Sequence, residues 1–292
     1  FIADMHTLTT LDNPQELRDN VLEVAKDYLA AGLDPNKSTI YTQSSVPEVA
    51  ELALYLAMFQ PLGELQVVPT YKDLVRKHPD RVTLGLITYP VLMAADIFGP
   101  RATLVPVGED QVPNVELARD LARKFNRRFG ETFIIPEMMK EMVKIPGLDG
   151  GKMGKSDASN AIDISAPIET IRTLYRKRGV TDPLKVNRDS PGDPFNRCKS
   201  VYAVHEAVTE GERSTRILAR RCIAGSLGCA ECKDLLVDRL AELIGPFQEK
   251  RRQLADQDDY VKDILTEGGR KVKKLFQATL DDVREKIGIV VY

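Results

Sequence analysis

The sequence predicts an α/β protein: a Rossmann-type nucleotide-binding domain with a parallel sheet, followed by an all-α helical domain. Over the first 165 residues, strand patterns alternate with helical patterns. Alternation at these lengths is typical of a parallel sheet with right-handed crossovers. From residue 168 onward the strand signals fade and helical periodicity dominates. We therefore expect one domain at 1–165, with its N-terminal part missing, and a helical domain at 166–292.

The expected elements follow from periodicity and from their end signals. An amphipathic helix at 14–33 ends at Gly32 and the Asp34-Pro35 pair. Residues 38–42 are rich in β-formers and predict a short buried strand. The other elements expected in the first domain are a helix from Pro47 to Met58, a helix at 89–98, a strand at 102–107 and a helix at 113–129. The helices expected later are at 168–178, 200–209, 212–222, 233–254 and 260–288, with a loop at 181–194.

Composition excludes several classes of protein. No run of 18 apolar residues predicts a membrane helix, and the first residues carry no basic flank of a signal peptide, so a cytoplasmic protein is expected. The net charge is −2, so a nucleic-acid partner cannot be argued from overall charge. Local basic clusters at 172–178 and 216–221 remain candidates for contact with a nucleic acid, although such runs are more often helix faces exposed to solvent.

The most specific segment is a glycine-rich string with two lysines, Gly147-Leu-Asp-Gly-Gly-Lys-Met-Gly-Lys-Ser-Asp157. Lys152 and Lys155 are compact point charges on flexible stems, which suit a phosphate chain that gains charge as it leaves. Glycines let the backbone approach the phosphates and let the loop close. A bare pair of lysines is more often an ordinary surface loop. The complete string, however, resembles the KMSKS signature of class I aminoacyl-tRNA synthetases, with Gly154 in place of a serine.

A second segment, 88–97, places Asp96 among apolar residues of an expected helix. A buried carboxylate needs a partner, and the alternative is an aspartate at a helix end facing water. An indole N–H only donates, so one carboxylate satisfies it. Met93 lies three residues earlier, where its thioether can pack on an aromatic ring. The segment resembles the tryptophan-pocket helix of tryptophanyl-tRNA synthetases, which implies that Tyr89, Met93 and Asp96 line the amino-acid site.

A third segment, 105–111, ends a strand pattern in a Gly-Glu-Asp-Gln turn. Ligands of parallel sheets bind beyond the carboxyl ends of the strands, although such turns also hold Asp and Gln as helix caps. There Asp110 can meet ribose hydroxyls and Gln111 a polar substrate group. The turn resembles the GxDQ motif of the same family, which implies that Val107 forms a pocket wall and that Gly108 and Asp110 contact ATP.

The opening of the chain, 1–6, resembles the second strand of this family, which leads into its active site. A lone His6 is more often a loop histidine, but the resemblance places it at the border of the tryptophan site. Gln43, Pro47 and Glu48 also fit the family's segment after the next strand. The family's HIGH-like motif is absent, and we expect it upstream of Phe1.

The resemblance extends to about Ala166 and implies a reaction, partners and further roles. Tryptophan would be activated with ATP and Mg²⁺ and then transferred to tRNA(Trp) by a homodimer. Domain 1–165 would be catalytic and domain 166–292 would bind the anticodon. The implied catalytic residues are Lys152, Lys155 and Ser156, and the implied ATP-binding residues are Gly108, Asp110, Val143, Lys152, Met153 and Lys155.

Four cysteines, Cys198, Cys222, Cys229 and Cys232, are separated by 23, 6 and 2 residues. Such clustering without export signals indicates a cytosolic metal site rather than disulfides, with unrelated thiols as the alternative. Four thiolates suit zinc or an iron–sulfur cluster. A subset of tryptophanyl-tRNA synthetases carries a similar pattern with a [4Fe–4S] cluster, so the resemblance favours that cluster over zinc.

Two rival hypotheses remain. A tyrosyl-tRNA synthetase must hydrogen-bond a phenol, which both donates and accepts, and Asp96 beside Met93 fits an indole better. A non-catalytic, synthetase-like paralogue is supported only by Gly154 and by the absent first motif.

Overall fold

The computed structural model describes residues 1–292 except 78–81, 140–144, 155–158, 210 and 292. The chain packs into two compact units, residues 1–142 with 254–292 and residues 143–253. This division differs from the expected boundary at 165/166 in two respects. The two-lysine loop belongs to the second unit, and the C-terminal helix belongs to the first.

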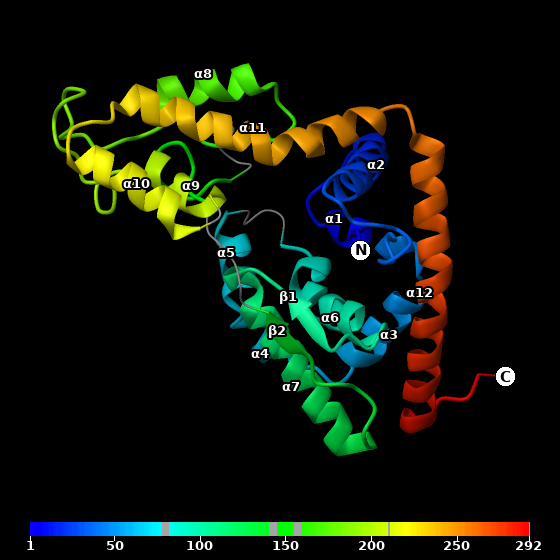
Figure 1. Cartoon of the computed structure of the whole chain (residues 1–292). Helices are drawn as coiled ribbons and strands as arrows, with labels where there is room; N and C mark the ends of the chain where they lie inside the picture. Colours follow the sequence, from blue (N-terminus) through cyan, green and yellow to red (C-terminus); the bar gives the residue numbers. More distant parts are fainter. Residues whose placement is uncertain (78–81, 140–144, 155–158, 210, 292) are drawn as a thin grey trace. The chain divides into compact units, whose positions relative to one another are not determined.

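The first unit is built mainly from helices (Figure 1). They are α1 (Asp4–Thr7), α2 (Pro14–Ala30), α3 (Glu48–Ala57), α4 (Leu62–Gln66), α5 (Pro69–Lys77), α6 (Leu84–Phe98), α7 (Val112–Phe129) and α12 (Asp258–Ile287), with the 3₁₀ turns η1 (Gln43–Ser45) and η3 (Glu109–Gln111). The helices expected at 14–33, 47–58, 113–129 and 260–288 are confirmed to within a few residues. The helix expected at 89–98 begins earlier, at Leu84, because the Thr83 hydroxyl caps it by accepting the amide N–H of Leu86.

The described strands of this unit are short and parallel. β1 (Leu104–Pro106) pairs with β2 (Glu137–Met139) in parallel register. Ile2 and Thr42 form a further parallel bridge, which is all that the expected strand at 38–42 contributes to pairing. The strand expected at 102–107 is therefore confirmed in a shorter form, whereas β2 had no clear sequence signal.

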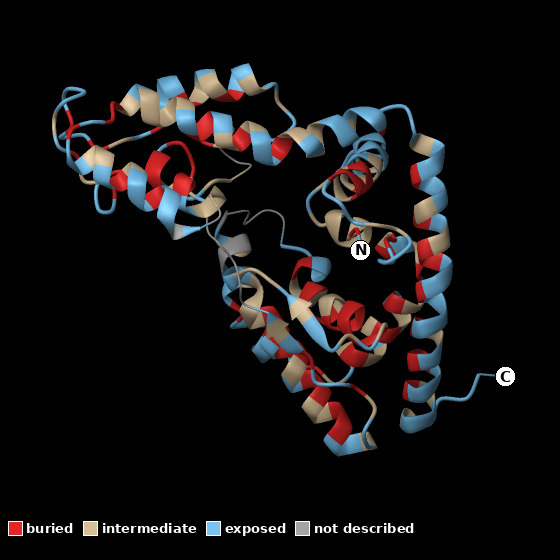
Figure 2. Ribbon diagram, in the orientation of Figure 1, coloured by how far each residue is buried: buried red, intermediate tan, exposed pale blue. Residues whose placement is uncertain are grey.

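α12 belongs to the first unit because one face of it completes that unit's core. Val272, Phe276, Leu280 and Val283 are buried there, and Figure 2 shows buried positions recurring along this helix. A Cβ on Gly268 would lie 1.9 Å from the carbonyl oxygen of Ile40. The helix can therefore approach the backbone that leads into η1 only because this residue is glycine.

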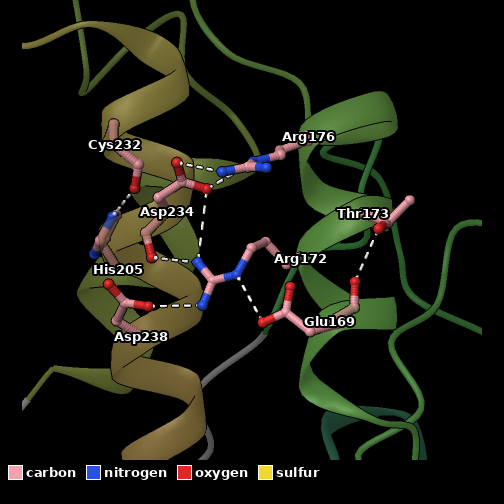
Figure 3. Close-up of polar contacts among 8 residues, drawn as sticks. All are labelled: Glu169, Arg172, Thr173, Arg176, His205, Cys232, Asp234 and Asp238. Carbon is pink, nitrogen blue, oxygen red and sulfur yellow. Dashed lines mark hydrogen bonds and ion pairs between the residues drawn. The ribbon is translucent and has the colours of Figure 1, made fainter.

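The second unit contains α8 (Ile168–Arg178), α9 (Val201–Val208), α10 (Glu212–Ile223) and α11 (Cys229–Gln253). All four expected helices are confirmed, although α11 begins four residues before the expected position 233. Arg172 of α8 binds Asp238 at 2.8 Å, and Arg176 binds Asp234 at 2.8 Å, as Figure 3 shows. Part of the basic cluster at 172–178 thus joins α8 to α11.

Candidate active site

Asp96 is a buried acceptor on α6. The residue is only 7% exposed, and its Oδ2 accepts a hydrogen bond from Gln43 Nε2 at 2.7 Å. Burial raises the pKa of Asp96 to about 7, while the hydrogen bond from Gln43 acts to lower it. The carboxyl group therefore titrates near neutral pH.

A chain of side chains connects this carboxylate with the turn before α7. The backbone N–H of His6 donates to Gln43 Oε1 at 3.2 Å, and the His6 ring lies 5.0 Å from the ring of Tyr89. Asn114 Nδ2 donates to Gln111 Oε1 at 2.9 Å and lies 3.4 Å from the hydroxyl of Tyr89. Residues of α1, η1, α6, η3 and α7 thus form one polar network around the position expected for the amino-acid side chain.

Asn114 did not emerge from the sequence, and Gln43 emerged without a role. Asn114 is fully buried and shares a helix face with Ala118 and Leu121, so a polar residue in an apolar stripe was the available signal. Gln43 is 1% exposed, and its backbone N–H donates to the carbonyl of Ile2 at 2.8 Å. The bridge to the 1–6 segment holds Gln43 in place.

The other residues expected to contact the amino acid or the nucleotide differ in how far they are buried. Met93 is half-buried and packs against the core of the first unit. Val107 and Gly108 are half-buried where β1 leads into η3. Asp110 is exposed within η3, immediately before Gln111.

The two-lysine loop lies in the second unit. Lys152 is exposed, and Met153 and Gly154 are half-buried. The remaining residues expected to act on ATP, Val143, Lys155 and Ser156, lie outside the described residues.

The four cysteines line one small cavity in the second unit, together with Asp182, Lys185 and Tyr202. All four thiols are free. Burial raises the pKa of Cys198 to about 11 and that of Cys232 to about 12. In the described part of the chain, no three His, Cys, Asp or Glu side chains are placed to hold a metal ion.

Residues 1–245 match the family model of tRNA synthetases class I (W and Y). The fold is thus that of a class I aminoacyl-tRNA synthetase, which confirms the expected α/β class. The tryptophan–tRNA ligase of Thermotoga maritima is 38% identical over 295 residues, covering 99% of this chain and 88% of that protein. Its counterpart from Deinococcus radiodurans is 38% identical, with 99% and 87% covered.

Solved structures agree with these relatives. The crystal structure of tryptophanyl-tRNA synthetase from Campylobacter jejuni, complexed with ADP and tryptophan, aligns with a TM-score of 0.84 at 35% identity. The alignment covers 99% of this chain and 88% of that one. The chain therefore belongs to the tryptophan–tRNA ligase family. None of the helices in the described ranges has the length and apolar character of a membrane-spanning segment.

Proposed function

We propose that the chain activates L-tryptophan with ATP and transfers the resulting tryptophanyl group to tRNA(Trp). The observation that carries this proposal is the buried carboxylate of Asp96, with Gln43 on one oxygen and His6 and Tyr89 in the same network. An indole N–H is a donor without acceptor capacity, so it matches the remaining lone pairs of this carboxylate. The relatives named above are tryptophan–tRNA ligases, which supports the same substrate.

In this proposal the first unit selects the amino acid and the two-lysine loop stabilises the reaction. Asp96 accepts the indole N–H, and Met93 and Val107 pack against the indole ring. Gln111 binds a polar group of the tryptophan substrate. The tryptophan carboxylate attacks the α-phosphorus of ATP, and the bond to pyrophosphate breaks. Lys152 and Lys155 stabilise the charge on the departing phosphates, which Mg²⁺ bound to ATP also neutralises.

The remaining nucleotide contacts in this proposal come from two regions of the chain. Gly108 and Asp110 would meet the adenosine part of ATP. Val143, Met153 and Ser156 would support the loop around the phosphates. The tRNA's terminal ribose hydroxyl then takes the tryptophanyl group from the adenylate, and AMP leaves.

We propose that this cytoplasmic enzyme works as a homodimer and that its helical part, expected at 166–292, reads the anticodon. Exposed apolar side chains on α3 and α4 and at the C-terminal caps of these helices support self-association, because such patches mark interaction sites. They are Leu54 at 55% exposure, Met58 at 69%, Leu62 at 56% and Val67 at 61%. The occupant we propose is the same surface of a second copy, as in an isologous interface.

We also propose that the four cysteines hold a [4Fe–4S] cluster. All four thiols border the same largely apolar cavity, and the backbone N–H of Tyr202 donates to the Cys198 sulfur at 3.4 Å. A cluster places each thiolate on a different iron, so its ligands lie farther apart than those of one zinc ion. When bound, the cluster would stabilise the fold.

Amino-acid-dependent exchange of pyrophosphate into ATP tests the proposed reaction on the full-length protein. Exchange with tryptophan and not with tyrosine is the expected result. Exchange with tyrosine would instead favour a tyrosyl-tRNA synthetase and overturn the role of Asp96. No exchange with either amino acid would favour a non-catalytic paralogue.

A further inference from the structure

Gln43 is oriented by two different partners. Its Oε1 accepts the backbone N–H of His6 at 3.2 Å, and its Nε2 donates to Asp96 Oδ2 at 2.7 Å. Because a backbone N–H cannot accept, the carbonyl end of the amide must face His6, and the NH₂ end must face Asp96. The residue is 1% exposed, so water does not compete for either end.

We propose that Gln43 is a positioning residue that sets amino-acid specificity by holding Asp96 as a hydrogen-bond acceptor. This inference rests on the proposed tryptophan site. An ionised Asp96 only accepts, and with Oδ2 occupied by Gln43 its Oδ1 is left for a donor such as an indole N–H. A protonated Asp96 gains an O–H donor, which a phenol oxygen can accept. Keeping the carboxylate ionised therefore favours tryptophan over tyrosine.

Asp96 needs a hydrogen-bond donor such as Gln43 because its surroundings favour the protonated carboxyl group. Burial disfavours the carboxylate and raises its pKa to about 7, so protonation competes near neutral pH. The titratable side chain facing Asp96 is the hydroxyl of Tyr41. Burial and the Asp96 charge raise the pKa of Tyr41, so it stays neutral, and burial lowers the pKa of nearby His6. Gln43 supplies a donor that carries no charge and does not titrate.

The backbone fixes the position of this donor. The N–H of Gln43 binds the carbonyl of Ile2 at 2.8 Å, and Ile2 binds the carbonyl of Tyr41 at 2.8 Å. On the other side, a Cβ on Gly269 would lie 2.6 Å from the Ser45 hydroxyl, so α12 lies directly against η1. Gln43 is thus fixed before the amino acid arrives, which is what a positioning residue requires.

The test measures binding of labelled tryptophan by equilibrium dialysis from pH 6 to 9.5, using the full-length protein. Gln43→Leu removes the donor while keeping an apolar side chain of similar length. We expect tryptophan affinity at pH 7.5 to fall about tenfold or more, the usual effect of losing a hydrogen bond to a charged group. The midpoint of the pH profile should move upward, affinity should recover toward pH 9.5, and ATP affinity should not change.

Two further variants separate positioning from general structural damage. Gln43→Glu keeps an acceptor for His6 but places a second carboxylate beside Asp96, which disfavours ionisation of Asp96, so tryptophan binding should need a higher pH than in the wild type. Gln60→Leu removes another buried glutamine of the same unit, one that binds Glu64 at 2.9 Å, and should leave the pH profile unchanged. Pyrophosphate exchange should also show a smaller preference for tryptophan over tyrosine in Gln43→Leu.

The proposal is overturned if Gln43→Leu keeps the wild-type affinity, or if it weakens tryptophan binding equally at every pH with an unmoved midpoint. Should Gln43→Leu fail to fold, the midpoint of the pH profile of Gln43→Glu still decides, because an unmoved midpoint in that variant would also overturn the proposal. Failure of the wild-type protein to bind tryptophan would contradict the proposed function itself. That result is distinct from an unchanged pH profile in a binding-competent variant.

Discussion

The side-chain oxygen of Asn160 accepts the backbone N–H of Asp149 at 2.9 Å, across eleven residues of the two-lysine loop. The same amide donates to the carbonyl of Lys152 at 3.4 Å, and the Asn160 carbonyl accepts the N–H of Leu148 at 3.1 Å. A Cβ on Gly147 would lie 2.5 Å from this side chain. The described part of this loop, from Gly147 to Lys152, is therefore held by one buried amide.

Asn160→Ala should impair use of ATP without affecting tryptophan binding. Losing the amide removes its hydrogen bonds to the N–H of Asp149 and the carbonyl of Lys152, each worth about 0.5–1.5 kcal/mol. Part of this loss is expected to appear as a roughly tenfold rise in the KM for ATP in pyrophosphate exchange. Asn196→Ala, an exposed asparagine of the same unit that binds Asp193, is the control. An equal loss of affinity for tryptophan would contradict this role for Asn160.

Asp96→Asn should weaken tryptophan binding strongly and stabilise the ligand-free protein at alkaline pH. The pKa of Asp96 rises from 3.8 to about 7 on folding, so the folded state binds more protons between these values. Stability is therefore lost as pH rises from about 4 to about 7, by an amount on the order of 2–4 kcal/mol. Asparagine does not ionise and avoids this loss.

Thermal unfolding at pH 4 and pH 8 checks this prediction. The Tm of Asp96→Asn should exceed that of the wild type at pH 8 but not at pH 4. Saturating tryptophan should raise the Tm of the wild type and have little effect on the variant. Asp120→Asn, on an exposed aspartate of α7 that pairs with Arg123, should change neither result. A variant less stable than the wild type at pH 8 would show that the Asp96 carboxylate is stabilised rather than strained by its site.

The sequence predicted secondary-structure elements and local motifs better than it predicted contacts between residues far apart in the chain. Asp96 could be singled out because a carboxylate in an apolar helix is conspicuous without any knowledge of its neighbours. Its partner Gln43 could not be assigned, because 53 residues separate the two and they meet through the packing of α6 against α3, the helix that follows η1. Local periodicity contains no information about such pairings.

The C-terminal helix illustrates the same limit. Its periodicity predicts a helix, but Gly268 and Gly269 lie in its interior, where glycine only weakens a helix. Glycine is needed at both positions because Ile40 and Ser45 lie against this helix, although they belong to a segment more than 200 residues away in the chain. The contiguous division at 165/166 followed from the change in secondary-structure pattern, and that pattern cannot show a helix that returns to the first unit.

Glutamate in place of Leu54 or Met58 should produce monomers. These two side chains lie four residues apart, Leu54 in the last turn of α3 and Met58 at its C-terminal cap, and are 55% and 69% exposed, so a charge there would be buried without a partner in a dimer. Light scattering after size-exclusion chromatography measures the mass of the variant and of the wild type. Leu275→Glu, an exposed position of α12, serves as the control. A dimer that survives both substitutions on α3 would place the interface elsewhere, and a monomeric wild type would contradict the proposed homodimer.

Removal of metal should destabilise the unit formed by residues 143–253. His205 is buried, and its Nε2 lies 3.0 Å from the carbonyl of Cys232, so this contact holds the start of α11, which thiolates bound to the proposed cluster would also hold. Protein purified without oxygen should absorb broadly near ~400 nm, as thiolate-ligated iron–sulfur clusters do. Treatment with a chelator should bleach this band and lower the unfolding temperature, because metal binding to a folded site is linked to folding.

Cys232→Ser should lose most of the iron, sulfide and absorbance, whereas Ser214→Ala, on an exposed position of α10, should retain them. Colourless protein with one zinc ion per chain would show that the cysteines bind zinc rather than an iron–sulfur cluster. Protein that contains neither metal, and whose unfolding temperature a chelator does not change, would leave four unrelated thiols around a small apolar cavity.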